Sequence, residues 1–231
     1  MDTLVYFLDV DPAREPQLAT EAGVMALAEG LSEGRKNKIR SMKFLGSKRQ
    51  SLGAGLLLDF GLRRFGMEER SACLEYRANG KPCLADRKDL YFNLSHSGNL
   101  VMAAFADVEV GCDVEQIKTA DFRVVRRFFA LEEQAFLEGC TSEMEKNDAF
   151  FRLWTLKEAF MKATGEGSRL PLSDFCIRPD LDPVTVAWKE LGAEYGFAEC
   201  MLEGYHGAVC VRDKEHVRKT FFSFQKLADV L

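Results

Sequence analysis

The sequence has no long apolar segment and no paired cysteines, and both absences narrow the class of protein. None of its apolar runs approaches the ~20 residues that a membrane-spanning helix needs. The chain starts MDTLVYFLDVD, with acidic residues where a signal peptide would carry positive charge, so we expect a cytoplasmic protein without membrane partners. The seven cysteines are scattered and include no CxxC pair, which argues against a zinc site and a disulfide framework. We expect reduced, mostly buried thiols.

The chain also lacks internal repeats, low-complexity tracts and long linkers. Its 231 residues are 47% hydrophobic and 29% charged, which is typical of a folded globular protein. The net charge of −5 argues against a general nucleic-acid-binding protein. Strands followed by helices occur twice along the sequence, so we predict an α+β fold with two similar halves, residues 1–108 and 109–231, that meet near residues 107–116.

Hydrophobic periodicity places the elements of each half. Alternating or short apolar runs predict strands at residues 3–10, 90–94, 100–106 and 108–114. Amphipathic spacing predicts helices at residues 22–31, 52–65, 122–138 and 148–163. The remainder, from about residue 175, reads as short strands and turns.

One stretch of the chain has no acidic residue. Between Gly34 and Leu58 there are seven lysines and arginines and no aspartate or glutamate. Such a local positive field on an acidic protein suits an anion, for example a phosphate group. The composition alone fits an ordinary solvated helix face equally well.

Two carboxylates end an apolar strand in the segment from Gly111 to Glu115. Because side chains alternate along a strand, Asp113 and Glu115 point to the same face. By themselves they are most simply solvent-exposed. Paired carboxylate oxygens are also the ligands that Mg²⁺ prefers, together with water and phosphate oxygens.

A second charged group lies on the helix around Trp154. Glu158 and Lys162 are i, i+4 neighbours, which an ordinary surface ion pair would also explain. Lys157 falls on the apolar side of this helix, where a lysine is costly to bury unless it is paired. We therefore interpret Lys157 as one partner of a structural ion pair.

The segment from Asn93 to Gly98 carries two serines and a histidine. Neither Ser95 nor Ser97 has glycine two residues to either side, so the nucleophile elbow of a hydrolase is not matched. We expect a loop that follows a strand and cradles an anion with hydroxyl, imidazole and backbone N–H groups. His96 alone carries no functional signal.

Taken together, five segments resemble the 4'-phosphopantetheinyl transferases in order and approximate spacing. They are NGKPCL at 79–84, FNLSHSGNLV at 92–101, VGCDVE at 110–115, RFFALEE at 127–133 and LWTLKEAFMKATGEG at 153–167. The resemblance is strongest to the two-lobed type that activates nonribosomal peptide and polyketide synthases, and it runs from about residue 30 to the end of the chain. It implies two pseudo-symmetric α+β lobes in a monomer.

The resemblance implies roles for individual residues. The Mg²⁺ or Mn²⁺ ion would be bound by Asp113, Glu115 and Glu158, and Glu158 and Lys162 would be catalytic. The other matched residues would contact coenzyme A. Lys81, Ser95 and His96 would contact phosphate oxygens. The residues from the basic stretch, Arg35, Lys38 and Ser51, would lie around the adenosine 3'-phosphate. The family commonly has isoleucine or valine where this chain has Cys112, and we expect little effect of that difference.

The implied reaction transfers phosphopantetheine from coenzyme A to a serine of an apo acyl or peptidyl carrier protein. The serine would attack the β-phosphorus, and adenosine 3',5'-bisphosphate would be released. A different Mg²⁺-dependent nucleotide or phosphate transferase is the alternative among enzymes. A non-catalytic carrier-protein or nucleotide-binding module is the alternative outside them, although the intact set of charged residues argues against it.

Overall fold

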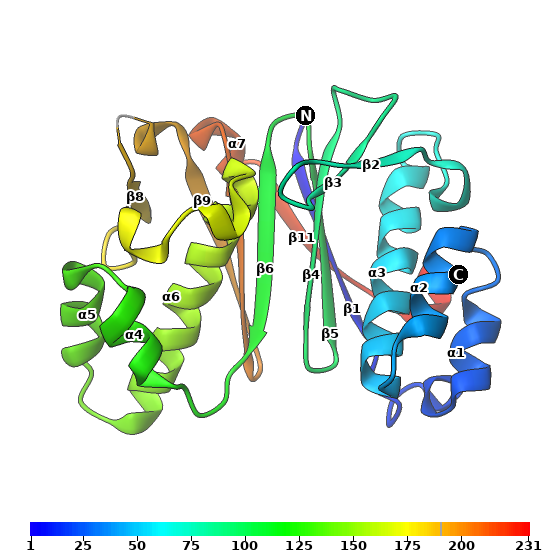
Figure 1. Cartoon of the computed structure of the whole chain (residues 1–231), viewed down its shortest axis with the longest axis horizontal. Helices are drawn as coiled ribbons and strands as arrows, with labels where there is room; N and C mark the ends of the chain where they lie inside the picture. Colours follow the sequence, from blue (N-terminus) through cyan, green and yellow to red (C-terminus); the bar gives the residue numbers. More distant parts are fainter. Residues whose placement is uncertain (190) are drawn as a thin grey trace.

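A four-stranded sheet organises the first half of the chain in this computed structural model, which describes residues 1–189 and 191–231. The sheet has the order β11-β1-β5-β4, and the pairs β1 with β5 and β5 with β4 are antiparallel. Its strands are β1 (Thr3–Asp9), β4 (Tyr91–Ser97), β5 (Leu100–Ala106) and β11 (Thr220–Gln225). The helices on its outer side are α1 (Glu21–Leu27), α2 (Glu33–Ser41), α3 (Leu45–Arg63) and α8 (Leu227–Val230) (Figure 1).

A three-stranded antiparallel sheet and one long helix organise the second half. The sheet has the order β6-β10-β9, and α6 (Glu143–Thr164) packs along β6 and β10. Its strands are β6 (Val110–Gln116), β9 (Gly196–Leu202) and β10 (Tyr205–Val211). The other α-helices and strands of the described residues are α4 (Phe122–Phe128), α5 (Leu131–Glu138), α7 (Lys214–Val217) and the pairs β2 (Leu74–Tyr76) with β3 (Pro82–Leu84) and β7 (Cys176–Arg178) with β8 (Thr185–Ala187).

The two halves form four layers in the order helix, sheet, sheet, helix (Figure 1). Each half has a long helix on antiparallel strands, and the predicted α+β class is confirmed. The two sheets share an apolar cluster whose side chains come from β1, β5, β6 and β10. Because Phe7, Met102, Cys112 and Val209 are all nearly or fully buried there, separating the halves would expose a continuous apolar surface to water.

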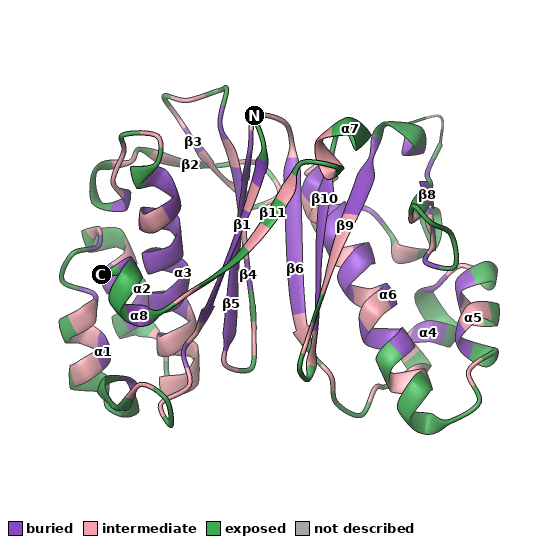
Figure 2. Ribbon diagram, turned by 180° about the vertical axis from the view of Figure 1, so that it is seen from behind, coloured by how far each residue is buried: buried purple, intermediate pink, exposed green. Residues whose placement is uncertain are grey.

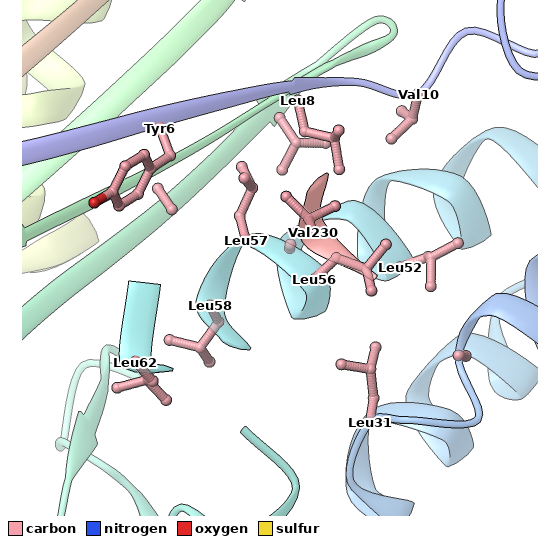
Figure 3. Close-up of a cluster of buried hydrophobic side chains, with 14 of the residues drawn as sticks. Tyr6, Leu8, Val10, Leu31, Leu52, Leu56, Leu57, Leu58, Leu62 and Val230 are labelled. Carbon is pink, nitrogen blue, oxygen red and sulfur yellow. The ribbon is translucent and has the colours of Figure 1, made fainter. Parts of the chain in front are cut away.

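The first half has its own apolar core between the sheet and α3. Figure 3 shows leucines of α3 directed toward β1 and toward Val230 of α8. Burial of one such leucine side chain contributes about 1.5 to 3 kcal/mol. Gly61 allows α3 to approach β5, since a Cβ at this position would lie 2.1 Å from the Phe105 ring. The α3 leucines in this core are Leu52, Leu56, Leu57, Leu58 and Leu62.

The end of the chain returns to the first half. Strand β11 pairs in parallel with β1, in the register Thr3 to Thr220, and α8 contacts α3. From behind, β11 runs diagonally from α7 to α8 across the back of the molecule (Figure 2). The division between residues 108 and 109 stays a prediction. Strand β11 and helix α8 belong to the second half by sequence, but they pack against β1 and α3 of the first half.

Two predicted helices differ in their bounds, since α1 ends at Leu27 and α3 begins at Leu45, and two further predicted elements differ in kind. The helix predicted over residues 122–138 is two helices, because Phe129 and Ala130 are extended and Glu133 Oε2 accepts a 3.0 Å hydrogen bond from the Ala130 N–H. The loop predicted after residue 94 is the end of β4, whose Ser95 lies opposite Met102 of β5.

No helix within the described residues has the length and hydrophobicity of a membrane span.

Candidate functional site

Strand β6 and helix α6 bring four charged side chains together. Gly111 lies directly under α6, since a Cβ there would be 2.1 Å from the Ala159 carbonyl oxygen. This close approach requires glycine and places Lys162 of α6 against the carboxylate of Asp113, at 2.7 Å. Residues 111, 113 and 115 share one face of β6, so the alternation predicted for this strand is what presents both carboxylates to α6.

Asp113 is the most buried carboxylate of the site, at 4% exposure. Its Oδ1 accepts hydrogen bonds from Lys162 Nζ and from Ser95 Oγ, both at 2.7 Å. Lys162 Nζ also donates to the Cys112 carbonyl oxygen at 3.0 Å. Within the described residues the second oxygen, Asp113 Oδ2, is buried without a hydrogen-bond partner, and such an atom is costly to leave unsatisfied.

The electrostatics of the cluster reflect crowded negative charge. Burial raises the pKa of Glu158, and the charge of Asp113 raises it further. Burial likewise raises the pKa of Glu115 against the opposing hydrogen bond from Ser97, and Asp113 again adds to the increase. Burial alone would lower the pKa of Lys162, but the Asp113 carboxylate and the other acidic groups beside it together outweigh burial, and the net pKa is raised. An additional cation would relieve this repulsion.

The residues predicted around the adenosine 3'-phosphate line one cavity of about 220 Å³. Its basic and polar lining comes from α2, α3 and β4: Arg35, Lys38, Ser51 and His96. The Ser51 hydroxyl is buried and has no hydrogen-bond partner among the residues that the structure describes. Partial burial lowers the pKa of Lys38, and the positive charge of Arg35 adds to this. An anion in the cavity would satisfy the hydroxyl and offset the repulsion.

Residues that line this cavity also make contacts that the predicted phosphate site did not include. Arg35 Nε lies 3.7 Å from Oε1 of Glu69, a buried acid that the basic stretch itself does not contain. His96 is directed to the cavity while its neighbour Ser95 contacts Asp113. Partial burial and the charge of Lys162 lower the pKa of His96. Adjacent residues of β4 therefore connect the cavity with the carboxylate cluster.

The Lys81 side chain does not line this cavity, although its neighbours Gly80 and Pro82 do. Its buried ammonium donates to Glu109 Oε2 at 3.1 Å and to the carbonyl oxygens of Val110 and Lys162 at 2.9 and 2.8 Å. These bonds use all three N–H groups and tie the start of β3 to β6 and α6. A phosphate contact for Lys81 stays a prediction.

Lys157 is part of a buried ion pair, as predicted. Its Nζ lies 2.6 Å from Glu133 Oε1, and both side chains have 0% exposure. The ammonium also donates to the Phe175 carbonyl oxygen and lies 4.0 Å from the centre of that ring. This pair joins α5, α6 and the start of β7 and is separate from the carboxylate cluster.

Sequence reasoning missed Asn93 and Ser97. Asn93 Oδ1 accepts a hydrogen bond from the Cys112 N–H at 2.9 Å, and Ser97 Oγ donates to Glu115 Oε2 at 2.6 Å. The available signal was the polar residue at every second position in NLSHS, which indicates one polar face of a strand.

We expect Asn93→Leu to destabilise the protein by about 1 to 3 kcal/mol, because the buried Cys112 N–H would lose its acceptor. Urea unfolding measures this change. Asn93→Asp keeps an acceptor oxygen and should lose less, and the exposed Asn37→Ala should shift the free energy of unfolding by less than about 0.5 kcal/mol. Equal stability of Asn93→Leu and wild type would show that this hydrogen bond does not support the fold.

Comparison with known proteins identifies the class of this chain. A family model described as the 4'-phosphopantetheinyl transferase superfamily matches residues 109–210. The 4'-phosphopantetheinyl transferase HetI of Nostoc sp. is 35% identical over 161 residues, which are 67% of this chain and 68% of the relative. The chain belongs to the 4'-phosphopantetheinyl transferase superfamily.

Other relatives match a smaller part of their length. The 4'-phosphopantetheinyl transferase Sfp of Bacillus subtilis is 35% identical over 130 residues, 56% of this chain and 58% of that protein. For psf-1 of Bacillus pumilus the identity is 36% over 133 residues, 57% of this chain and 56% of the relative. The matched region thus spans little more than half of these relatives. The holo-[acyl-carrier-protein] synthase structure from Thermotoga maritima is 18% identical with a TM-score of 0.40, covering 46% of this chain and 64% of that one.

Proposed function

We propose that this protein transfers phosphopantetheine from coenzyme A to the serine of an apo carrier protein of a nonribosomal peptide or polyketide synthase. Membership of the superfamily supports the reaction class. The observation that carries the proposal is the arrangement on β4, where His96 lines the basic cavity and Ser95 contacts the carboxylate cluster. A coenzyme A molecule with its 3'-phosphate in the cavity would extend its pyrophosphate toward Asp113.

The carboxylate cluster suits a divalent cation. Asp113 Oδ2 has no hydrogen-bond partner in residues 1–189 and 191–231, and hard carboxylate oxygens are what Mg²⁺ and Mn²⁺ prefer. Within the described residues no group of three acidic, histidine or cysteine side chains is already arranged around a common metal position. The residues that would hold the ion are Asp113, Glu115 and Glu158. When bound, the ion would neutralise charge on the pyrophosphate.

The protein's own residues then have distinct tasks. Phosphoryl transfer depends mainly on positioning and on neutralisation of negative charge. Lys162 would stabilise charge on the transferring group or on the departing bisphosphate. Glu158 would accept the proton of the carrier serine hydroxyl, whose oxygen forms the new bond to the β-phosphorus as the bond to the leaving phosphate breaks. The product besides the loaded carrier is adenosine 3',5'-bisphosphate, and its appearance on chromatography only when both substrates are present tests the reaction.

Lys38→Ala is expected to raise KM for coenzyme A by about 10- to 150-fold, because a charge-assisted hydrogen bond to phosphate contributes about 1.5 to 3 kcal/mol. The turnover number should change less, since the 3'-phosphate is remote from the reacting phosphorus. Lys38 is a cleaner choice than Arg35, whose loss also removes the contact with Glu69. Steady-state kinetics with coenzyme A and with dephospho-coenzyme A measure the effect.

The two substrates separate two roles of the basic stretch. If Lys38 binds the 3'-phosphate, Lys38→Ala should leave use of dephospho-coenzyme A unchanged. Equal losses with both substrates would instead assign Lys38 to docking of the carrier protein. Lys43→Ala is the matched control, because Lys43 is exposed and lies over Phe44 rather than in the cavity.

We further propose that the protein acts as a monomer. The apolar cluster between the two sheets is built within one chain and supports pairing of the halves without a second copy. Light scattering at micromolar concentration should give the mass of one chain.

A further inference from the structure

Side chains join the two sheets where their edge strands meet. Strand β4 is the last strand of the first sheet, and β6 is the first strand of the second. Alternate residues of β4 accept hydrogen bonds from backbone N–H groups of β6: Asn93 from Cys112, Ser95 from Val114 and Ser97 from Gln116, at 2.9, 3.4 and 3.2 Å. All three pairs are separated by 19 residues, so the two strands run in the same direction with a fixed register.

The two serines of this ladder make the same pair of contacts. Ser95 Oγ accepts from the Val114 N–H and donates to Asp113 Oδ1, and Ser97 Oγ accepts from the Gln116 N–H and donates to Glu115 Oε2. Each hydroxyl therefore accepts a hydrogen bond from one backbone N–H of β6 and donates one to the carboxylate of the β6 residue just before that N–H. The two-residue period of the strands repeats this contact at the second carboxylate.

We propose that Ser97 is a positioning residue that orients the Glu115 carboxylate for a divalent cation, an inference that rests on the proposed function. A glutamate has three side-chain torsions, and at this partly exposed position packing alone does not fix them. The 2.6 Å bond from Ser97 holds one carboxylate oxygen beside the β6 backbone, and the second oxygen remains available as a ligand. Groups that orient metal ligands in this way commonly change metal affinity when they are removed.

The test measures Mn²⁺ binding without coenzyme A or carrier protein, from the electron paramagnetic resonance signal of free Mn²⁺. Ser97→Ala should weaken Mn²⁺ binding by about 10-fold or more, while Ser97→Thr, which keeps the hydroxyl, should restore most of the affinity. Ser223→Ala is the matched control, because this exposed strand serine contacts Gln225 far from the cluster. The thermal midpoint of metal-free Ser97→Ala should stay near wild type, since water can replace the hydroxyl at the exposed Gln116 N–H.

The outcomes separate this inference from the proposed function. If the wild-type protein loads a carrier protein but binds Mn²⁺ no more tightly than Ser97→Ala, the positioning role of Ser97 is overturned and the transferase function stands. Wild type that binds Mn²⁺ and loses affinity on Ser97→Ala, but loads no carrier, retains the positioning role and contradicts the transferase. A Ser97→Thr variant as weak as Ser97→Ala also overturns the inference, because it would show that the hydroxyl is not the relevant group.

Discussion

Asp113→Ala and Glu158→Ala are each expected to lower kcat/KM for phosphopantetheine transfer by about 10²-fold or more, and Glu158→Ala by up to about 10⁴-fold, because a general acid-base group typically contributes about 10²- to 10⁴-fold. Each removes a hard oxygen ligand and leaves phosphate charge unscreened. Glu158 should be the harsher loss because we assign it the serine proton as well as the ion. Steady-state kinetics at several Mg²⁺ concentrations, with circular dichroism to confirm folding, make the comparison.

Two further variants sharpen this prediction. Glu158→Gln keeps the shape of the side chain and one oxygen ligand but removes the proton acceptor, so near-normal turnover at saturating Mg²⁺ would contradict the combined role. Cys112→Val should be nearly silent, because Cys112 is buried in the apolar cluster between the sheets and a swap of similar volume usually costs less than about 1.5 kcal/mol.

Lys157→Met is expected to destabilise the protein by about 3 to 5 kcal/mol, because it leaves the fully buried Glu133 without its ammonium partner. Glu133 keeps hydrogen bonds from the Ala130 and Ile177 N–H groups, so the double variant Lys157→Met with Glu133→Gln should regain a large part of the loss. Urea unfolding measures both free energies.

The exposed pair of Arg123 and Asp121 provides the control for this measurement. Arg123→Ala should change the free energy of unfolding by no more than about 1 kcal/mol, as is usual for solvated ion pairs. A Lys157→Met variant that is as stable as wild type but inactive would move Lys157 from a structural role to the chemistry.

Much of the site could be predicted from the sequence, because the relative positions of neighbouring side chains follow the periodicity of the strand and of the helix. Alternation along β6 predicted that Asp113 and Glu115 share a face, and i, i+4 spacing predicted that Glu158 lies beside Lys162 on α6. Neither the strand alternation nor the helix spacing predicted how closely α6 approaches β6. That distance depends on the absence of a Cβ at Gly111, which only the packing of the two elements reveals.

The features that were not predicted depend on contacts between distant segments. We predicted a loop after residue 94, although period-two alternation in NLSHS is typical of a strand, and the contact of Ser97 with Glu115 depends on the register of β4 against β6. The break between α4 and α5 arises because Glu133 binds the Ala130 N–H and Lys157. The return of β11 to β1 joins residues from opposite ends of the chain, which no local pattern encodes.

The most direct test of the account is intact-mass spectrometry of an apo peptidyl carrier protein incubated with the protein, Mg²⁺ and coenzyme A. The account predicts that the carrier gains the mass of one phosphopantetheine group, that the gain disappears when the acceptor serine is replaced by alanine, and that it disappears with Glu158→Ala. A panel of acyl and peptidyl carriers that all keep their apo mass, while the protein still binds coenzyme A, would contradict the transferase and favour a non-catalytic nucleotide-binding module.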